Sequence, residues 1–104
     1  MNYNKYVIEL SPLEWCNIPR VENLYNRNQF LIRVDGRIYF QSYESIIAFI
    51  HNDEIYIDVD FINYSKTTSK HLYIFLREYA ELNINNLKEL NNFIKRKFIK
   101  LYRA

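Results

Sequence analysis

The fold is decided by the stretch Tyr64-Ser65-Lys66-Thr67-Thr68-Ser69-Lys70-His71, because the residue pattern changes on either side of it. After it, apolar residues recur at the three- and four-residue spacing that forms one side of a helix. These residues are Leu72, Phe75, Leu76, Tyr79 and Ala80, and the amphipathic run ends at Leu82. Before it, β-branched and aromatic residues alternate as they do in strands. The stretch therefore marks the change from sheet to helix.

Four hydroxyl residues stand at the start of this predicted helix: Ser65, Thr67, Thr68 and Ser69. A side-chain oxygen in such a place accepts a hydrogen bond from one of the first backbone N–H groups, so Ser65, Thr67 or Thr68 can act as the cap. One cap is sufficient for one helix, and the remaining hydroxyls allow two interpretations. Either they are redundant caps with exposed neighbours, or they join the free amides and the positive helix end to bind a phosphate or carboxylate.

Cationic side chains and a tyrosine accompany the hydroxyls, so the candidate site for a partner or an anion comprises the whole stretch. Its residues are Tyr64, Ser65, Lys66, Thr67, Thr68, Ser69, Lys70 and His71. Lys66, Lys70 and His71 supply positive charge or hydrogen-bond donors there.

The end of the chain is basic, with no acidic residue after Glu89. The basic residues of this tail are Lys95, Arg96, Lys97, Lys100 and Arg103. Positive charge near a helix C-terminus is stabilising by itself. The alternative is a stripe that contacts phosphates or an acidic protein. If the two last helices pack side by side, the tail forms one basic face together with Lys66 and Lys70.

Four segments ahead of residue 64 have the composition and alternation of strands. They are Gln29–Val34, Arg37–Tyr43, Ser45–His51 and Glu54–Val59. A helix over Ser42–Ile50 also fits the apolar spacing, but the β-branched content of this segment favours the strand. The pair Asp35-Gly36 predicts a tight hairpin between the first two strands, because these residues tolerate positive backbone angles. One face of the hairpin is expected to carry Phe30, Ile32, Val34, Ile38 and Phe40. The preceding segment, Arg20–Asn28, is expected to be irregular because its asparagines favour turns.

A short helical turn is predicted after a weakly alternating segment Lys5–Leu10, which fits a short strand, and a helix is predicted near the C-terminal end. Ser11 and Pro12 have the order of a helix start, and Pro19 restricts that helix to a short turn. Asn86 is expected to cap the last helix with Glu89 as its capping-box partner. The apolar stripe of that helix is Leu87, Leu90, Ile94, Phe98 and Leu101. The predicted fold is α+β in a single domain, residues 1–104: an antiparallel sheet of about four strands, two C-terminal helices packed on one face, and a short N-terminal helical turn.

Composition limits the classes of partner and compartment. The formal charge of +2 is too small to indicate nucleic acid by itself, and it argues against an acidic DNA mimic. A single cysteine, Cys16, favours a reducing compartment, so a cytoplasmic protein is expected. The sequence shows no secretory signal and no apolar run near the roughly 20 residues that span a bilayer, so no membrane partner is expected. The many tyrosines and isoleucines are compatible with a homodimer.

One group of residues has the chemistry of metal ligands. It consists of Asp53, Glu54, Asp58 and Asp60, with His51 close by. A metal site requires such groups to converge at about 2.0–2.6 Å from the ion. A solvated hairpin tip explains the same residues, so the sequence assigns no catalytic residue, no metal and no cofactor. A small metal-dependent enzyme built on this group is kept as an alternative.

The helix-start stretch also carries a resemblance. Tyr-Ser-Lys-Thr-Thr-Ser-Lys-His at 64–71, preceded by Phe40–Ala48 and Ile55–Asp58, resembles a small uncharacterised domain found in phages and mobile elements. In that domain a Y-S-x-T-T-S-K-H motif opens a helix after a segment S-Y-x-T-I-I-A, and Ser45 here replaces the commoner threonine. The similar region is residues 38–80. The resemblance implies a phage or mobile-element origin and no established activity.

Small accessory proteins of such origin often act on host machinery, as anti-CRISPR proteins do. By analogy with those accessory proteins, we expect a non-catalytic binding protein in the host cytoplasm, which blocks or modulates a host protein or ribonucleoprotein such as a CRISPR effector. A direct nucleic-acid-binding protein is the first alternative, because of the basic tail and the hydroxyl-rich helix start. The small metal-dependent enzyme is the second.

Overall fold

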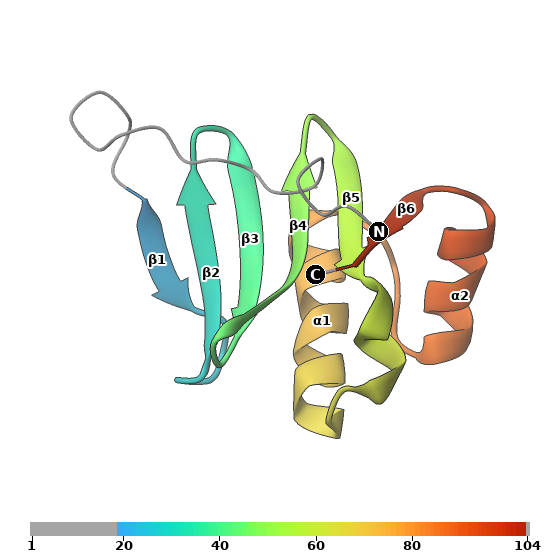
Figure 1. The fold of residues 1–104 in the computed structure, drawn as a ribbon, viewed down its shortest axis with the longest axis horizontal. Helices are drawn as coiled ribbons and strands as arrows, with labels where there is room; N and C mark the ends of the chain where they lie inside the picture. The colour runs from blue at the N-terminus through green and yellow to red at the C-terminus, as the bar shows by residue number, and fades with distance from the viewer. Residues whose placement is uncertain (1–18, 104) are drawn as a thin grey trace.

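The computed structural model describes residues 19–103, which form a six-stranded sheet with two α-helices on one side (Figure 1). In chain order the elements are β1 (Arg20–Asn23), β2 (Gln29–Val34), β3 (Arg37–Ser42), β4 (Ser45–His51), β5 (Glu54–Asp58), the 3₁₀ helix η2 (Val59–Asn63), α1 (Lys66–Tyr79), α2 (Leu87–Lys95) and β6 (Ile99–Tyr102). The strands follow one another across the sheet in chain order, and all neighbours are antiparallel except β5 and β6. The α+β class is confirmed, but the sheet is larger than predicted, and it is mixed.

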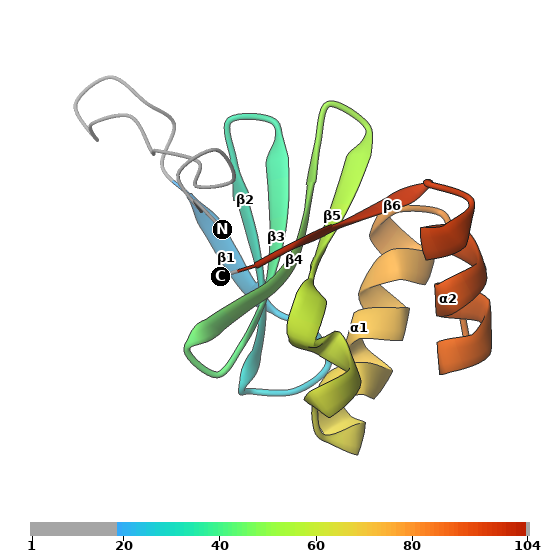
Figure 2. The same ribbon diagram turned by 45° about the vertical axis from the view of Figure 1, so that its right-hand side comes forward.

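The helices lie between β5 and β6 in the chain, because strands that run parallel cannot be joined by a tight turn. Both views place α1 and α2 on the same side of the sheet (Figures 1 and 2). Their buried side chains meet those of the strands in a single core. Its members are Leu24, Leu31, Phe40, Ile47, Ala48, Ile55, Ile57, Phe61, Leu72, Phe75, Leu76, Ile84, Leu90 and Ile99.

A two-residue turn joins β2 to β3, as the Asp35-Gly36 pair predicts. The backbone angle φ is 48° at Asp35 and 75° at Gly36, which is the left-handed region that this pair tolerates. The turn pairs Val34 directly with Arg37 and thereby fixes the register of the whole hairpin.

The faces predicted for this hairpin are wrong. Across it, Leu31 pairs with Phe40 and Ile32 pairs with Tyr39, so an even-numbered residue shares its face with an odd-numbered one. A two-residue turn imposes this offset, and strand side chains alternate between faces. Phe40 and, by the same alternation, Ile38 therefore face the helices together with Leu31. Ile32 and Tyr39 lie on the opposite face of the sheet.

The prediction of an irregular Arg20–Asn28 segment is wrong for its first part, which forms β1. All four residues of β1 are exposed, so the strand has no buried alternation for a sequence pattern to reveal. The asparagines do form the turn that follows, because Asn26 accepts hydrogen bonds from the backbone N–H of Asn28 and of Gln29. Antiparallel pairing with β2 is therefore what makes this segment a strand.

The last predicted helix is also too long. Helix α2 ends at Lys95, and Lys97 has a positive φ of 62°, which a continuing helix does not allow. The chain then forms β6 parallel to β5, and Ile99 and Tyr102 are buried there. The apolar residues of this segment are three and four residues apart, which fits a helix. The segment is a strand because its backbone forms hydrogen bonds with the edge of β5. Phe98, predicted to lie on the buried stripe, is 53% exposed.

The remaining elements agree closely with the sequence. Strands β2 and β4 have the predicted bounds, and β3 and β5 each end one residue earlier than predicted. Helix α1 buries Leu72, Phe75 and Leu76 as its spacing predicts. The predicted N-terminal strand, the helical turn after it and Cys16 lie outside the described residues. Within residues 19–103, no helix is long and apolar enough to cross a membrane.

The contact between α1 and the sheet predicts a large loss of stability in Phe75→Ala. The Phe75 ring is fully buried and stacks on Phe40 with 5.7 Å between ring centroids. Truncating a buried phenylalanine costs about 3–5 kcal/mol in the free energy of unfolding. Urea denaturation measures the loss, and Tyr43→Ala is the control because Tyr43 is 58% exposed. Equal losses in the two variants would contradict this placement of α1.

Candidate functional site

The start of α1 is capped by one residue of the candidate stretch. The side chain of Ser65 accepts a hydrogen bond from the backbone N–H of Thr68 at 3.2 Å, and the Ser65 carbonyl accepts from the N–H of Ser69. This is the geometry of an N-cap. Ser65 is thus the capping residue among the three that the sequence leaves open.

The Thr68 hydroxyl ties the helix start to the sheet. It accepts a hydrogen bond from the Ser65 hydroxyl at 3.1 Å and lies 3.0 Å from the hydroxyl of Ser42 on β3. Both Thr68 and Ser42 are buried. Two of the four hydroxyls at the helix start, those of Ser65 and Thr68, therefore serve internal bonds, and a surface anion has to be bound by other groups.

His71 is 5% exposed and is held by its own helix. Its Nδ1 lies 2.7 Å from the backbone carbonyl of Thr67. A carbonyl can only accept, so Nδ1–H is the donor, and in the neutral ring Nε2 is then an acceptor. His71 also lines a groove on the surface of α1, so its imidazole belongs partly to the core and partly to the site.

A layer of buried polar side chains, which the sequence pattern does not predict, lies beneath this end of α1. It consists of Gln29, Ser42, Thr68 and His71, which come from β2, β3 and α1. Gln29 is fully buried, pairs in register with Ser42, and has no hydrogen-bond partner for either side-chain amide atom among the described residues. In the sequence, the layer is marked only by the polar residues Gln29 and Ser42 at the paired ends of β2 and β3. Polar residues are common where strands end, so this pattern does not by itself indicate burial.

Two grooves flank the outer side of α1. One, of about 620 Å³, is lined by Tyr25, Asn26, Thr67, Lys70, His71, Ile74, Arg77 and Glu78. The other, of about 410 Å³, is lined by Lys66, Ser69, Lys70, Tyr73, Arg77 and Asn85. Lys70 and Arg77 line both grooves and so form the ridge between them. We call Lys66, Lys70 and Arg77 the cationic face of α1.

Local contacts hold the walls of these grooves. Arg77 donates to the backbone carbonyl of Ile84 at 2.9 Å and to the Asn85 side chain at 3.1 Å, which fixes its guanidinium over the loop after α1. On the other wall, the Tyr25 hydroxyl donates to Glu78 at 2.7 Å. This hydrogen bond and the negative charge of Glu78 raise the pKa of Tyr25. The Glu78 carboxylate is therefore occupied by Tyr25.

The cationic face carries uncompensated charge. Among residues 19–103 the ion pairs are Arg33 with Glu22 and Lys100 with Glu54, so neither Lys66 nor Lys70 has a carboxylate partner there. The first turn of α1 contains no acidic residue. Because the N-terminal end of a helix is itself positive, lysine side chains at this end add to its field. The arrangement attracts negatively charged groups.

Tyr64 lies apart from the grooves. Its hydroxyl is buried and has no hydrogen bond of good geometry among the described residues. Burial raises the pKa of Tyr64 well above the ordinary range of a phenol, and the nearby Asp58 carboxylate raises it further. At neutral pH the Tyr64 side chain is therefore an uncharged, partly buried ring beneath the helix start.

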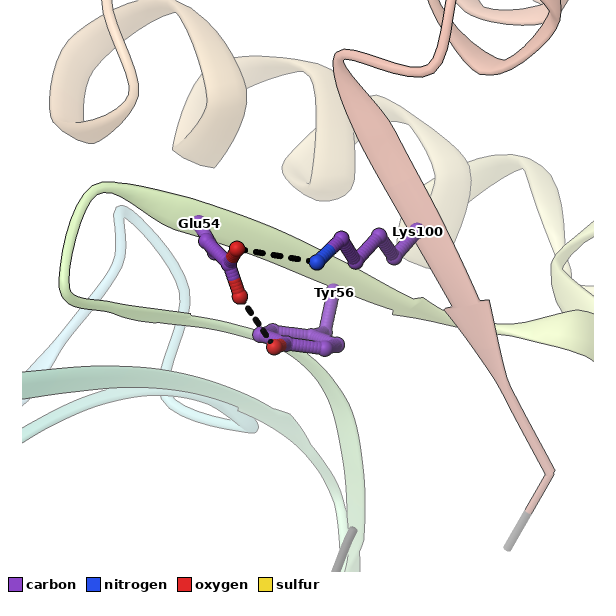
Figure 3. A network of polar contacts seen from close by, with 3 residues as sticks. All are labelled: Glu54, Tyr56 and Lys100. Atoms are coloured by element: carbon purple, nitrogen blue, oxygen red, sulfur yellow. Dashed lines mark hydrogen bonds and ion pairs between the residues drawn. The ribbon is translucent and has the colours of Figure 1, made fainter.

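None of the basic-tail residues lines either groove beside α1. Lys100 on β6 lies on the face of the sheet opposite the helices, where it pairs with Glu54 at 2.9 Å beside Tyr56 (Figure 3). The Glu54 hydrogen bond raises the pKa of Lys100. Arg96 lies over the exposed ring of Phe98, with 5.0 Å between its guanidinium carbon and the ring centroid.

The acidic group predicted near β5 does not converge. Glu54 accepts hydrogen bonds from Tyr56 at 2.6 Å and from Lys100 at 2.9 Å, and these bonds lower its pKa (Figure 3). Asp58 instead caps η2 by accepting from the N–H of Asp60 at 3.0 Å. Within the described part of the chain, no three His, Cys, Asp or Glu residues are grouped so that they could hold a metal ion. The metal-dependent alternative therefore has no support in residues 19–103.

Comparison with known proteins places the chain in a family but assigns no activity. The model of DUF8033, a family of unknown function, matches residues 14–92, so the chain belongs to that family. The match covers β1 to β5, α1 and most of α2, which includes both grooves. No curated protein and no solved structure matches the chain.

The buried hydroxyl network predicts different outcomes for two neighbouring threonines. Thr68→Val removes the oxygen that Ser65 and Ser42 share and leaves the buried Ser42 hydroxyl without a partner. Leaving such a group unsatisfied costs about 1–3 kcal/mol of unfolding free energy. Thr67→Val is the matched control, because Thr67 is exposed. Urea denaturation compares the two, and equal stabilities would contradict the internal role of Thr68.

Tyr64 predicts a loss of stability at alkaline pH. An unfolded tyrosine ionises near pH 10, whereas the folded pKa of Tyr64 is raised, as is that of Tyr102. Their contribution is therefore complete below about pH 10 and decreases as pH rises above it. Tyr64→Phe should reduce this alkaline loss, and it should cost little at pH 7 because the hydroxyl it removes has no hydrogen bond of good geometry among residues 19–103. Chemical denaturation at pH 7 and above pH 10 tests both statements, and an unchanged alkaline loss would contradict the burial of this phenol.

Proposed function

We propose that this member of the DUF8033 family is a non-catalytic binding protein of phage or mobile-element origin. It acts by covering a surface of a host protein or nucleoprotein, such as a CRISPR effector, with the cationic face of α1. The observation that carries the proposal is the ridge of Lys70 and Arg77 between two open grooves, with no carboxylate paired to Lys66 or Lys70 among residues 19–103. The origin is supported by the similarity of residues 64–71 to the phage and mobile-element motif.

The chemistry of the grooves suits a protein surface with acidic side chains. Tyr25 on one side and Tyr73 on the other border the ridge, and tyrosine contributes apolar contact area together with a polar tip. Arg77 is fixed by Ile84 and Asn85, so less conformational freedom is lost when it meets a carboxylate. Acidic groups of the partner would lie on the ridge and apolar groups would fill the grooves beside it.

The geometry around His71 supports binding rather than turnover. Nucleophilic catalysis requires a base next to a nucleophile, with a third group that orients the base. Here the imidazole is oriented by the backbone carbonyl of its own helix, and the neighbouring Thr68 hydroxyl is engaged with Ser42 and Ser65. Tyr64 remains protonated because its pKa is raised. These groups fix the shape and charge of the surface.

Direct binding to nucleic acid is the second candidate, and the observation that favours it lies elsewhere on the molecule. Arg96 lies over both Phe93 and Phe98, and Phe98 is 53% exposed. An exposed aromatic ring backed by a guanidinium is a platform on which a base can stack. Lys95 and Lys97 beside it supply charge for the phosphates.

Charge reversal at the ridge tests the proposed function. Lys70→Glu places a negative charge on the wall of both grooves, and partner binding should weaken at least about tenfold because like charges then meet. Lys88→Glu is the matched control: it makes the same change at an exposed lysine of α2 that lines neither groove. Tagged protein is used to capture partners from host lysate, with and without nuclease, and the affinity of each variant for the captured partner is then measured.

The outcomes separate the two candidates. A nuclease-resistant protein partner that Lys70→Glu loses and Lys88→Glu retains supports the proposal. Capture that disappears with nuclease, and is weakened by Phe98→Ala rather than by Lys70→Glu, assigns the nucleic-acid function instead. Equal binding by both charge-reversal variants to a protein partner would exclude α1 as the binding surface.

A further inference from the structure

Among residues 19–103, strand β1 is the last strand on its side of the sheet and has an open edge. Among the strands of the described residues it pairs with β2 alone, so its other side has no backbone partner there. Every residue of β1 is exposed, and Val21 is 59% exposed. Proteins usually protect such an edge, because its free N–H and C=O groups bind other strands.

The register shows which residues direct their backbone groups outward. The ladder of β1 and β2 continues to Leu24, whose N–H donates to the carbonyl of Gln29 at 2.8 Å. In an antiparallel ladder, hydrogen-bonded and non-hydrogen-bonded pairs alternate. Arg20 and Glu22 therefore bond toward β2 with their backbone, and Val21 and Asn23 direct their N–H and C=O groups toward the open side.

The side chains of β1 carry an unbalanced charge pattern. Arg20 lies directly opposite Arg33 of β2, and like charges in such a cross-strand pair are destabilising. Glu22 forms a long ion pair of 3.8 Å with Arg33 and lies on the same face of the strand as Arg20. Arg20 therefore lacks a carboxylate directly opposite it, and a strand added on the open side can supply one.

We propose that the open edge of β1 binds β1 of a second copy of this chain, antiparallel, about a twofold axis at Val21. In this register Arg20 lies opposite Glu22 of the partner subunit, and Glu22 lies opposite the partner's Arg20. The outward N–H and C=O groups of Val21 pair with those of the partner's Val21. The interface is isologous, so each favourable contact occurs twice.

Charge selects this register over its neighbours. Since the outward backbone groups alternate along β1, the two strands can slide only in steps of two residues. A shift one way centres the axis on Arg20 and places two arginines opposite each other. A shift the other way centres it on Glu22 and places two glutamates opposite each other. The register centred on Val21 alone pairs opposite charges.

The apolar face of the sheet continues through the same position. Paired residues form a row across the strands on the face opposite the helices: Val21, Ile32, Tyr39, Phe49 and Tyr56. Adjacent rings in it lie 5.6 Å apart for Tyr39 and Phe49, and 4.6 Å apart for Phe49 and Tyr56. In the proposed dimer the two Val21 side chains meet and join the rows of both subunits.

The test is the mass of the full chain in solution, measured by sedimentation across a concentration series. The wild type should form a dimer. Val21→Pro removes only an outward N–H, so β1 keeps its bonds to β2 while the dimer is lost. Glu22→Arg places arginine opposite arginine across the axis and should weaken the dimer at least about tenfold. The double variant Arg20→Glu with Glu22→Arg restores opposite charges and should restore the dimer.

Circular dichroism of each variant shows that the fold is retained. The second substitution also places a carboxylate opposite Arg33 within the subunit, so rescue by the charge swap supports the proposed register when urea denaturation shows Glu22→Arg and the double variant to be equally stable. A wild-type dissociation constant weaker than about 1 mM overturns the proposal. A dimer that survives Val21→Pro and Glu22→Arg equally overturns it too, since its interface then lies elsewhere. A wild-type monomer whose β1 edge binds an extended peptide would assign the edge to a peptide instead.

Discussion

The packing of α1 against the sheet is the interaction on which the rest of the structure depends. Phe75 stacks on Phe40, and Leu72 and Leu76 bury the same side of the helix. With this side fixed, the helical period directs Lys70 and Arg77 away from the core. The cationic face is therefore a consequence of core packing. The packing of the opposite side of α1 fixes where the cations lie, without any contact between them. A change in the rotation of α1 would move both grooves and the ridge together.

The start of α1 combines burial with polarity, which is energetically demanding. A buried hydroxyl or amide is stabilised only when its hydrogen bonds are formed. Thr68 meets this requirement through Ser42 and Ser65, and His71 meets it through its own helix. Gln29 does not meet it with any described residue. This polar layer fixes where α1 begins relative to β3, because sliding the helix by one residue would break the shared Thr68 contact.

Local signals in the sequence predicted much of the fold. Asp35-Gly36 specifies its turn, Asn86 caps α2 by accepting from the N–H of Glu89, and Ser65 caps α1. Even the capping box of α2 differs slightly, since Glu89 accepts from the N–H of Asn85 rather than from that of the cap residue. Each of these signals acts within a few residues, so the chain carries the information without the tertiary structure.

What the sequence did not predict depends on partners that are distant along the chain. Strand β6 exists because β5 offers it an edge, and its Tyr102 hydroxyl donates to the carbonyl of Ile46 at 2.9 Å. Strand β1 has no buried residue, so only its pairing with β2 identifies it as a strand. The candidate site has the same character. The stretch 64–71 was identified as a unit, but burial divides it: Thr68 and His71 belong largely to the interior, while Lys66 and Lys70 are exposed.

The edge of β1 and the outer side of α1 are linked by the geometry of the sheet. A twofold axis between antiparallel edge strands is perpendicular to the sheet, so it leaves the helices of both subunits on the same side of one continuous sheet. The two cationic faces of such a dimer would point in a common direction. A partner with repeated acidic surfaces could then engage both at once, and the second contact would form at the high effective concentration set by the first. In this way, a dimer contact at the edge of β1, although it involves few residues, would strengthen the binding of a partner to the cationic faces of α1.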